Sequence, residues 1–189
     1  MIRAMTRRQR SKLARRGALA CAALLLVCGA YIWFAHFRLP PQPPPLVPLT
    51  GQIDRIEIDK SDRRMTVFRE GQALRSYDIA LGFAPGGDKS QQGDGRTPEG
   101  TFRIDRRNPQ SSFHLSLGID YPQPEDIARA RAEGVSPGGD IFIHGQPNLL
   151  PFDIIRKGDW THGCIAVSNL EMEELWRVTP IGTEVVILP

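Results

Sequence analysis

Residues 50–189 predict a mainly β domain, a sandwich or barrel-like sheet assembly with two short helices. Three observations favour this fold class. Most apolar runs are short and rich in β-favouring residues, turn signals separate them, and only two stretches carry helix start and stop signals. The chain has 189 residues, of which 41% are hydrophobic and 24% charged, so it is long enough to bury one core of this kind.

The expected strands follow one another along this region. "RMTVFREGQALRSYDIALG" contains two β-rich runs joined at "REGQ", which predicts a hairpin turning at Gly71. In "QIDRIEID" the alternation is imperfect, because Ile53 is out of phase with Ile56 and Ile58. "FAPGGDKSQQGDGRTPEG" (83–100) is rich in Gly, Pro, Asp and Gln and predicts a long loop. Further strands are expected at 101–105, 112–119, 138–145 and 182–189.

Two stretches predict helices. "QPEDIARARAEG" (123–134) has acidic residues in its first turn and Gly134 as a C-terminal stop. "SNLEMEELWRVTP" (168–180) offers a capping box of Ser168 with Glu171 and ends at Pro180.

The N-terminal end of the chain differs from the rest in charge. Residues 1–38 hold eight of the 24 Lys and Arg residues and no Asp or Glu. The other residues therefore carry 16 basic groups against all 21 acidic ones. The formal net charge of +3 comes from one end of the chain, so we expect no nucleic-acid partner.

This end predicts a membrane segment. The basic residues 1–16 are expected in the cytoplasm, before an apolar span at 17–37 whose length suits a bilayer. A cleaved signal peptide is the alternative, since "CGA" before Tyr31 resembles a cleavage site. In both cases residues 50–189 are exported. The proline-rich segment 38–49 is expected to be an extended spacer, with a ligand of a proline-binding module as the alternative.

Cys164 is the one cysteine outside the apolar span. Having no intramolecular disulfide partner, it is either buried and inert or used in chemistry. Composition alone favours an inert thiol, because Cys164 is followed by isoleucine, alanine and valine. A zinc site of His144, His162 and Cys164 lacks the second Cys pair of a structural zinc pattern. "GDGRTPEG" (93–100) resembles a phosphate loop but lacks Gly-Lys-Ser/Thr.

A nucleophilic Cys164 needs a proton acceptor and an oxyanion site. If the backbone around Gly163 is extended, His162 and Cys164 lie on the same face. His144 ends its own predicted strand, where an imidazole could take the thiol proton. Backbone N–H groups of Gly163 and Cys164 could stabilise an oxyanion. His114 is expected to be a satisfied strand histidine, with a place in a substrate groove as the alternative.

His144, sixteen intervening residues and then "THGCI" (161–165) resemble the signature of L,D-transpeptidases with a YkuD-type catalytic domain. The resemblance covers about residues 51–188, because "GDGRTPEGTFRI", "SSFHLSLGIDYP", "PGGDIFIHG" and "THGCIAVSN" occur in the order typical of this family. It implies an L,D-transpeptidase-like β-sandwich with Cys164 as nucleophile and His144 as base. A backbone carbonyl near Gly145 would orient the imidazole.

The resemblance also assigns the surrounding residues. His162 would shape the pocket, Thr161 would replace a frequent serine, and Gly163 and Cys164 would supply the oxyanion donors. Many relatives carry Arg or Asn shortly after the cysteine, whereas Ala166 here cannot contact a carboxylate. Asn169 is expected to be a helix cap, with substrate contact as the alternative.

The implied reaction is acyl transfer without metal or cofactor. A peptidoglycan stem tetrapeptide would pass through a Cys164 thioester to an amine on another stem or on a wall-linked protein. The implied location is the inner (cytoplasmic) membrane, single-pass with the catalytic domain in the periplasm, or the periplasm alone if the N-terminus is cleaved. Two alternatives stay open: a hydrolytic carboxypeptidase or amidase on the same substrates, and a non-catalytic wall-binding module.

Overall fold

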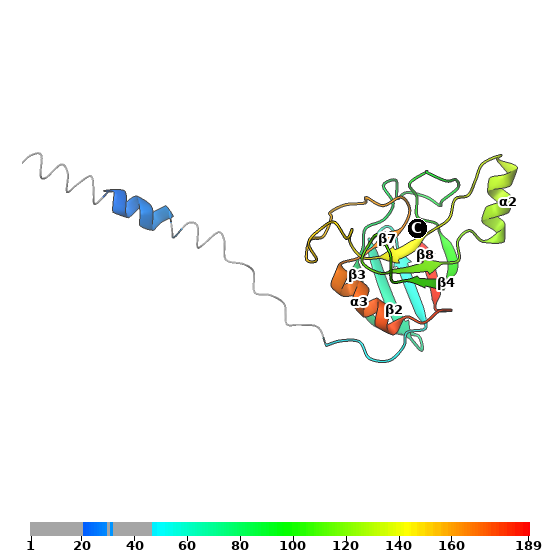
Figure 1. Cartoon of the computed structure of the whole chain (residues 1–189), viewed down its shortest axis with the longest axis horizontal. Coiled ribbons are helices and arrows are strands. Elements are labelled where there is room, and N and C mark those ends of the chain that lie inside the picture. The colour runs from blue at the N-terminus through cyan, green and yellow to red at the C-terminus, as the bar shows by residue number, and fades with distance from the viewer. Residues whose placement is uncertain (1–20, 30, 32–46) are drawn as a thin grey trace, which may run out of the picture. The chain divides into compact units, whose positions relative to one another are not determined.

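The computed structural model describes residues 21–29, 31 and 47–189 (Figure 1). Residues 21–29 are helical and exposed, and Val47–Pro189 forms a separate compact unit. Within these described ranges, no helix is both long and apolar enough to cross a membrane. The predicted basic segment 1–16 lies outside the described residues, as do parts of the predicted anchor 17–37 and most of the predicted linker 38–49.

Within Val47–Pro189, eight strands form one mixed sheet in the order β3-β2-β1-β8-β4-β5-β6-β7. β1 pairs in parallel with β8, and β6 with β7, whereas the other neighbours are antiparallel. The two-residue β7 is the strand that the sequence did not predict, because so short a run has no periodicity to detect. The bounds are β1 Arg55–Asp59, β2 Arg64–Arg69, β3 Gln72–Asp78, β4 Gly100–Asn108, β5 Ser116–Ile119, β6 Phe142–His144, β7 Ile165–Ala166 and β8 Glu184–Leu188.

The predicted hairpin is confirmed, with Arg69 paired to Gln72 across a two-residue turn. Both turn residues have positive φ, 51° at Glu70 and 78° at Gly71, which is the twist that suits a tight β-hairpin. Ile53 precedes β1 and is buried, and its N–H donates to the Val178 carbonyl at 2.9 Å. Ile53 is therefore out of phase with Ile56 and Ile58 because it lies before the strand begins.

The sheet is closed across its two edge strands. Just after β3, Ala80 and Ala166 exchange two backbone hydrogen bonds, at 2.9 and 2.8 Å. The Thr161 N–H donates to the Leu81 carbonyl at 3.1 Å, which extends this junction toward the cysteine segment. β4 changes register between Ile104 and Arg106, and such an irregularity bends a strand. The predicted barrel-like assembly is thus confirmed, and the closure places residues 161–166 beside the end of β3.

Both predicted helices in this unit are present. α2 (Pro124–Ala132) buries only Ala130 and projects from the sheet (Figure 1). Its end is followed by Gly134, at φ 71°. α3 (Asn169–Val178) has the predicted capping box, in which Ser168 accepts from the Glu171 N–H and the Glu171 carboxylate accepts from the Ser168 N–H. α3 packs on the core through Met172, Leu175 and Val178.

The compact unit begins three residues before the predicted start at residue 50. Arg75 donates to the Val47 carbonyl at 2.6 Å, and the Leu49 N–H donates to the Glu174 carboxylate at 3.0 Å. Arg75 and Glu174 form a salt bridge of 2.6 Å that is largely buried. The end of the predicted linker is therefore fixed along β3 and α3.

Candidate active site

Cys164 stands directly before β7 and is half-buried. It opens into a cavity of about 610 Å³, and its Sγ donates to the Asp140 carbonyl at 3.5 Å. Burial raises the pKa of the thiol; the Phe142 N–H opposes that rise and the Asp140 carboxylate adds to it. The resting nucleophile is therefore a thiol.

His144 ends β6 and is paired in register with Ala166 of β7. Cys164 directly precedes β7, so the chain brings it next to the strand that ends at His144. The imidazole is 2% exposed, stacks on Phe113 at 4.2 Å between ring centroids, and meets Trp160 edge-on at 5.8 Å. The two predicted catalytic residues thus come from neighbouring segments, and aromatic rings enclose the histidine.

The tautomer of His144 follows from its neighbour in the chain. Nδ1 and the Gly145 carbonyl oxygen lie 2.7 Å apart, so Nδ1 carries the proton and Nε2 keeps its lone pair. Burial lowers the pKa of His144 to about 4, although the bond to Gly145 opposes the shift. The Gly145 carbonyl thus contacts the His144 ring, in agreement with the orienting contact that the resemblance implied.

The resting pair is consequently a neutral imidazole and a neutral thiol. Neither a thiolate nor an imidazolium is stabilised before substrate enters, because burial disfavours both charged forms. The arrangement suits general-base catalysis, in which the proton moves from Sγ to Nε2 as the nucleophile attacks. Sγ must turn from the Asp140 carbonyl toward Nε2 for that step.

Thr161 fixes the turn that carries the cysteine. Its Oγ1 donates to the Cys164 carbonyl at 2.7 Å and accepts from the Gly163 N–H at 3.1 Å. The Gly163 N–H is therefore engaged in the resting structure, and its predicted oxyanion role requires this bond to break. The Cys164 N–H is the donor that needs no such change.

Gly163 could not be replaced at this turn without strain. Its φ is +125°, and an added Cβ would lie 2.6 Å from the Arg96 carbonyl oxygen. The loop before β4 thus packs directly on the backbone next to the nucleophile.

His162 is exposed and lines the same cavity as Cys164. The backbone between them bends at Gly163, with φ +125°, so the extended conformation on which this placement was predicted is absent there. The His162 ring meets Phe83 edge-on, with 5.5 Å between centroids. Within the described residues no group of three His, Cys, Asp or Glu side chains is placed to hold a metal ion, so the zinc site weighed above has no counterpart there.

His114 and Asn169 both lie next to Gly145, outside the lining of the cavity that holds Cys164. The His114 Nε2 is 3.2 Å from a Glu173 carboxylate oxygen, and its backbone N–H donates to the Gln146 carbonyl at 2.9 Å. The Asn169 amide accepts from the Gln146 N–H at 2.7 Å and donates to the Phe152 carbonyl at 2.9 Å. The predicted cap role of Asn169 is wrong, because Ser168 caps α3 and Asn169 is its first residue. Substrate contact by either residue stays a prediction.

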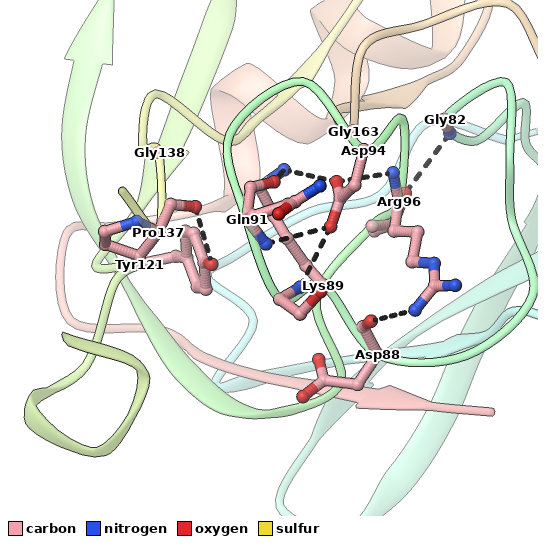
Figure 2. Close-up of polar contacts among 12 residues, drawn as sticks. Gly82, Asp88, Lys89, Gln91, Asp94, Arg96, Tyr121, Pro137, Gly138 and Gly163 are labelled. Atoms are coloured by element: carbon pink, nitrogen blue, oxygen red, sulfur yellow. Dashed lines mark hydrogen bonds and ion pairs between the residues drawn. The ribbon is translucent and has the colours of Figure 1, made fainter. Parts of the chain in front are cut away.

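Sequence reasoning missed two parts of the site. Phe113 and Trp160, which enclose His144, are distant in sequence and gave no local signal. The sequence marked residues 93–100 by their resemblance to the family but assigned no site role to the loop 88–97, which supplies cavity residues Lys89, Gln92 and Gly93. Figure 2 shows its Asp94 hydrogen-bonded to Lys89, Gln91 and Arg96.

Comparison with known proteins places this geometry in a family. The model of the YkuD L,D-transpeptidase catalytic domain matches residues 53–187. The chain belongs to this family. Its site therefore occurs within a YkuD domain that covers most of the chain.

Individual relatives agree with that assignment. A curated Escherichia coli K12 protein named "Putative L,D-transpeptidase YafK" is 27% identical over 135 residues, which are 68% of this chain and 48% of YafK. The helical cell shape determining protein Pgp2 from Campylobacter jejuni has a similar structure, with TM-score 0.56 and 26% identity over 72% of this chain and 48% of Pgp2. Bd1075 of Bdellovibrio bacteriovorus gives a TM-score of 0.52 and 25% identity over 75% of this chain and 50% of Bd1075. The chain spans about half the length of each.

Proposed function

We propose that this protein is a peptidoglycan L,D-transpeptidase that transfers the acyl group of a stem tetrapeptide through a thioester on Cys164. The observation that carries the proposal is the placement of Cys164 directly before β7 and of His144 at the end of the paired strand β6, inside a YkuD domain, with Cys164 lining a cavity of about 610 Å³. A cavity of that volume suits a peptide segment of a few residues.

In the first half-reaction, Sγ attacks the carbonyl carbon of the third stem residue while His144 Nε2 takes the thiol proton. The Cys164 N–H stabilises the oxyanion. The carbon–nitrogen bond to the terminal D-alanine then breaks, and the imidazolium returns the proton to the leaving amine. The Gly145 carbonyl holds the ring in place and stabilises the transient imidazolium through Nδ1–H.

In the second half-reaction, an acceptor amine attacks the thioester and gives its proton to Nε2. Sγ leaves and is reprotonated, and the product is a new amide on a neighbouring stem or on a wall-linked protein. We further propose that the catalytic domain acts in the periplasm, held at the inner membrane by residues 17–37 or released by their cleavage. The basic, then apolar, N-terminal sequence supports this location.

A hydrolytic carboxypeptidase or amidase is the second candidate, because His144 is 2% exposed and enclosed by Phe113 and Trp160. Water reaches such a base more easily than an amine on a bulky stem. Likeness to a cell shape determining protein accords with either outcome, since both joining and trimming of stems alter the wall.

Mass spectrometry of full-length protein incubated with disaccharide-tetrapeptide tests the proposal. A cross-linked dimer with loss of one D-alanine is the expected product. Tripeptide alone would assign the hydrolytic reaction instead. Unchanged substrate, with Cys164 intact and the protein folded, would contradict both reactions on this substrate.

A further inference from the structure

The cavity beside Cys164 has an uneven distribution of charge. Of the Lys, Arg, Asp and Glu residues, Lys89 and Asp140 line this cavity. The Asp140 carboxylate is exposed and pairs with Arg106 at 3.2 Å. Lys89 belongs to the loop 88–97 and is 2% exposed. Lys89 pairs with Asp94 of the same loop at 2.7 Å, so a buried ion pair lies beside the cavity that Cys164 lines.

The Lys89 ammonium has donor capacity left. Its Nζ donates to the Asp94 carboxylate at 2.7 Å and to the Gln91 carbonyl at 3.2 Å (Figure 2). An ammonium has three N–H donors, so these contacts leave one.

The partner carboxylate pairs with this ammonium and is itself held in place. Asp94 also accepts from the backbone N–H groups of Ser90, Gln91 and Arg96, at 2.9 to 3.1 Å. Burial alone would raise the pKa of Asp94, but the bond from Lys89 and these N–H groups hold it at about 2. The ion pair therefore stays charged and fixed, and the third N–H of Lys89 is what it can offer a ligand.

The loop is held against the catalytic segment, so the position of Lys89 relative to Cys164 is fixed. The Arg96 carbonyl packs on Gly163, and Arg129 of α2 donates to the Lys89 carbonyl at 2.9 Å. The Gln92 N–H donates to the Ser136 carbonyl at 2.7 Å, which joins the two walls of the cavity. Such preorganisation is what a recognition site requires.

We propose that Lys89 is the carboxylate-recognition residue of this cavity, its third N–H binding a carboxylate of the acyl donor, and that Asp94 positions it. The identity of the donor rests on the proposed function. Two of its carboxylates qualify: that of the leaving D-alanine, and one on the side chain of the third residue. The side chain of Ala166 is a methyl group and cannot supply this contact.

Thiol modification tests the recognition of a carboxylate without any peptidoglycan substrate. Full-length protein is treated with 2-carboxyethyl methanethiosulfonate or with neutral ethyl methanethiosulfonate. In each case the Cys164 thiolate attacks the reagent's divalent sulfur, a mixed disulfide forms, methanesulfinate leaves, and the thiol proton goes to solvent. The rate is read on the Cys164 peptide by mass spectrometry, so modification of Cys21 and Cys28 does not interfere.

The ratio of the anionic to the neutral rate should fall about tenfold in Lys89→Met, the loss expected for a charged hydrogen bond. A change in thiol pKa affects both reagents equally and cancels from the ratio. Lys157→Met, at an exposed lysine outside the cavity lining, should leave the ratio unchanged. Equal ratios in wild type and Lys89→Met would overturn the proposal.

Substrate analogues then separate the two carboxylates and need no variant that must fold. Wild-type protein is given the tetrapeptide, its C-terminal carboxamide, and a tetrapeptide with lysine as third residue. Slower turnover of the carboxamide assigns the D-alanine carboxylate, and slower turnover of the lysine peptide assigns the side chain. Equal turnover of all three overturns the inference while the proposed function stands. No turnover, with a Lys89-dependent reagent ratio, overturns the proposed function and not carboxylate recognition.

Discussion

The hydroxyl of Thr161 is hydrogen-bonded to the carbonyl of Cys164, with 2.7 Å between the oxygens, and also accepts the N–H of Gly163. One side chain, 3% exposed, thereby closes the turn on which the nucleophile stands. Both hydrogen bonds use the hydroxyl of Thr161 rather than its methyl group.

Thr161→Val keeps the shape of this side chain and removes both hydrogen bonds. We expect the free energy of unfolding to fall by about 1–3 kcal/mol, since a buried N–H and a carbonyl lose their partner. Turnover should fall further than the stability loss explains, because the turn no longer fixes Sγ. Thr161→Ser is the control and should behave as wild type. Urea unfolding and turnover of the tetrapeptide measure the two effects, and equal behaviour of both variants would contradict this role.

Cys164→Ala should abolish turnover and covalent trapping by a carbapenem, because Cys164 is the one thiol among the residues that line the cavity. The substitution removes one sulfur at the edge of a cavity, so the fold should persist. Intact-mass spectrometry after carbapenem treatment checks the adduct. Cys28→Ala, in the N-terminal part of the chain, is the matched control and should still be trapped. A trapped Cys164→Ala protein would contradict the assignment.

His144 should make stability depend on pH between about 6.5 and 4. Its folded pKa of about 4 lies below the ordinary histidine value of 6.5, so the unfolded chain binds more protons in this window. The free energy of unfolding should therefore fall as pH falls, by about 3 kcal/mol across the window. His144→Gln should remove this part of the slope, whereas His114→Gln, at a partly exposed histidine, should retain it. Urea denaturation at a series of pH values measures both, and identical slopes would show that His144 is not buried in the neutral form.

Gly145→Ala should destabilise the fold next to His144, the proposed general base. An added Cβ would lie 2.6 Å from both the Asn169 Oδ1 and the His114 carbonyl oxygen, so the segment after β6 must shift. Overpacking of this kind costs about 1–3 kcal/mol. Displacement of the Gly145 carbonyl should also release the His144 ring and reduce turnover. Gly86→Ala, with no atom within 4 Å of its added Cβ, is the control. Thermal unfolding compares the two, and equal melting temperatures would refute the crowding.

The sequence by itself determined the elements and the chemistry of the site. Alternation and turn residues predicted the β2–β3 hairpin, and cap residues predicted α2 and α3, because these signals act over a few neighbouring residues. Composition alone favoured an inert Cys164, and it was the resemblance of the frame from His144 to Cys164 to a known family that singled out these two residues as the predicted catalytic pair. The same resemblance implied that a carbonyl near Gly145 orients His144.

The tertiary structure decided what distant segments do to one another. The closure of Ala80 on Ala166, the aromatic enclosure of His144 and the approach of Arg96 to Gly163 join residues that no local pattern connects. Asn169 was misjudged because capping depends on which residue is last before the helix, a boundary set by packing. Local sequence patterns also gave no sign that the Cys164 thiol and the His144 imidazole are neutral, or that the charge of Lys89 is buried. Both depend on desolvation, and desolvation is a property of the folded surroundings rather than of any single residue.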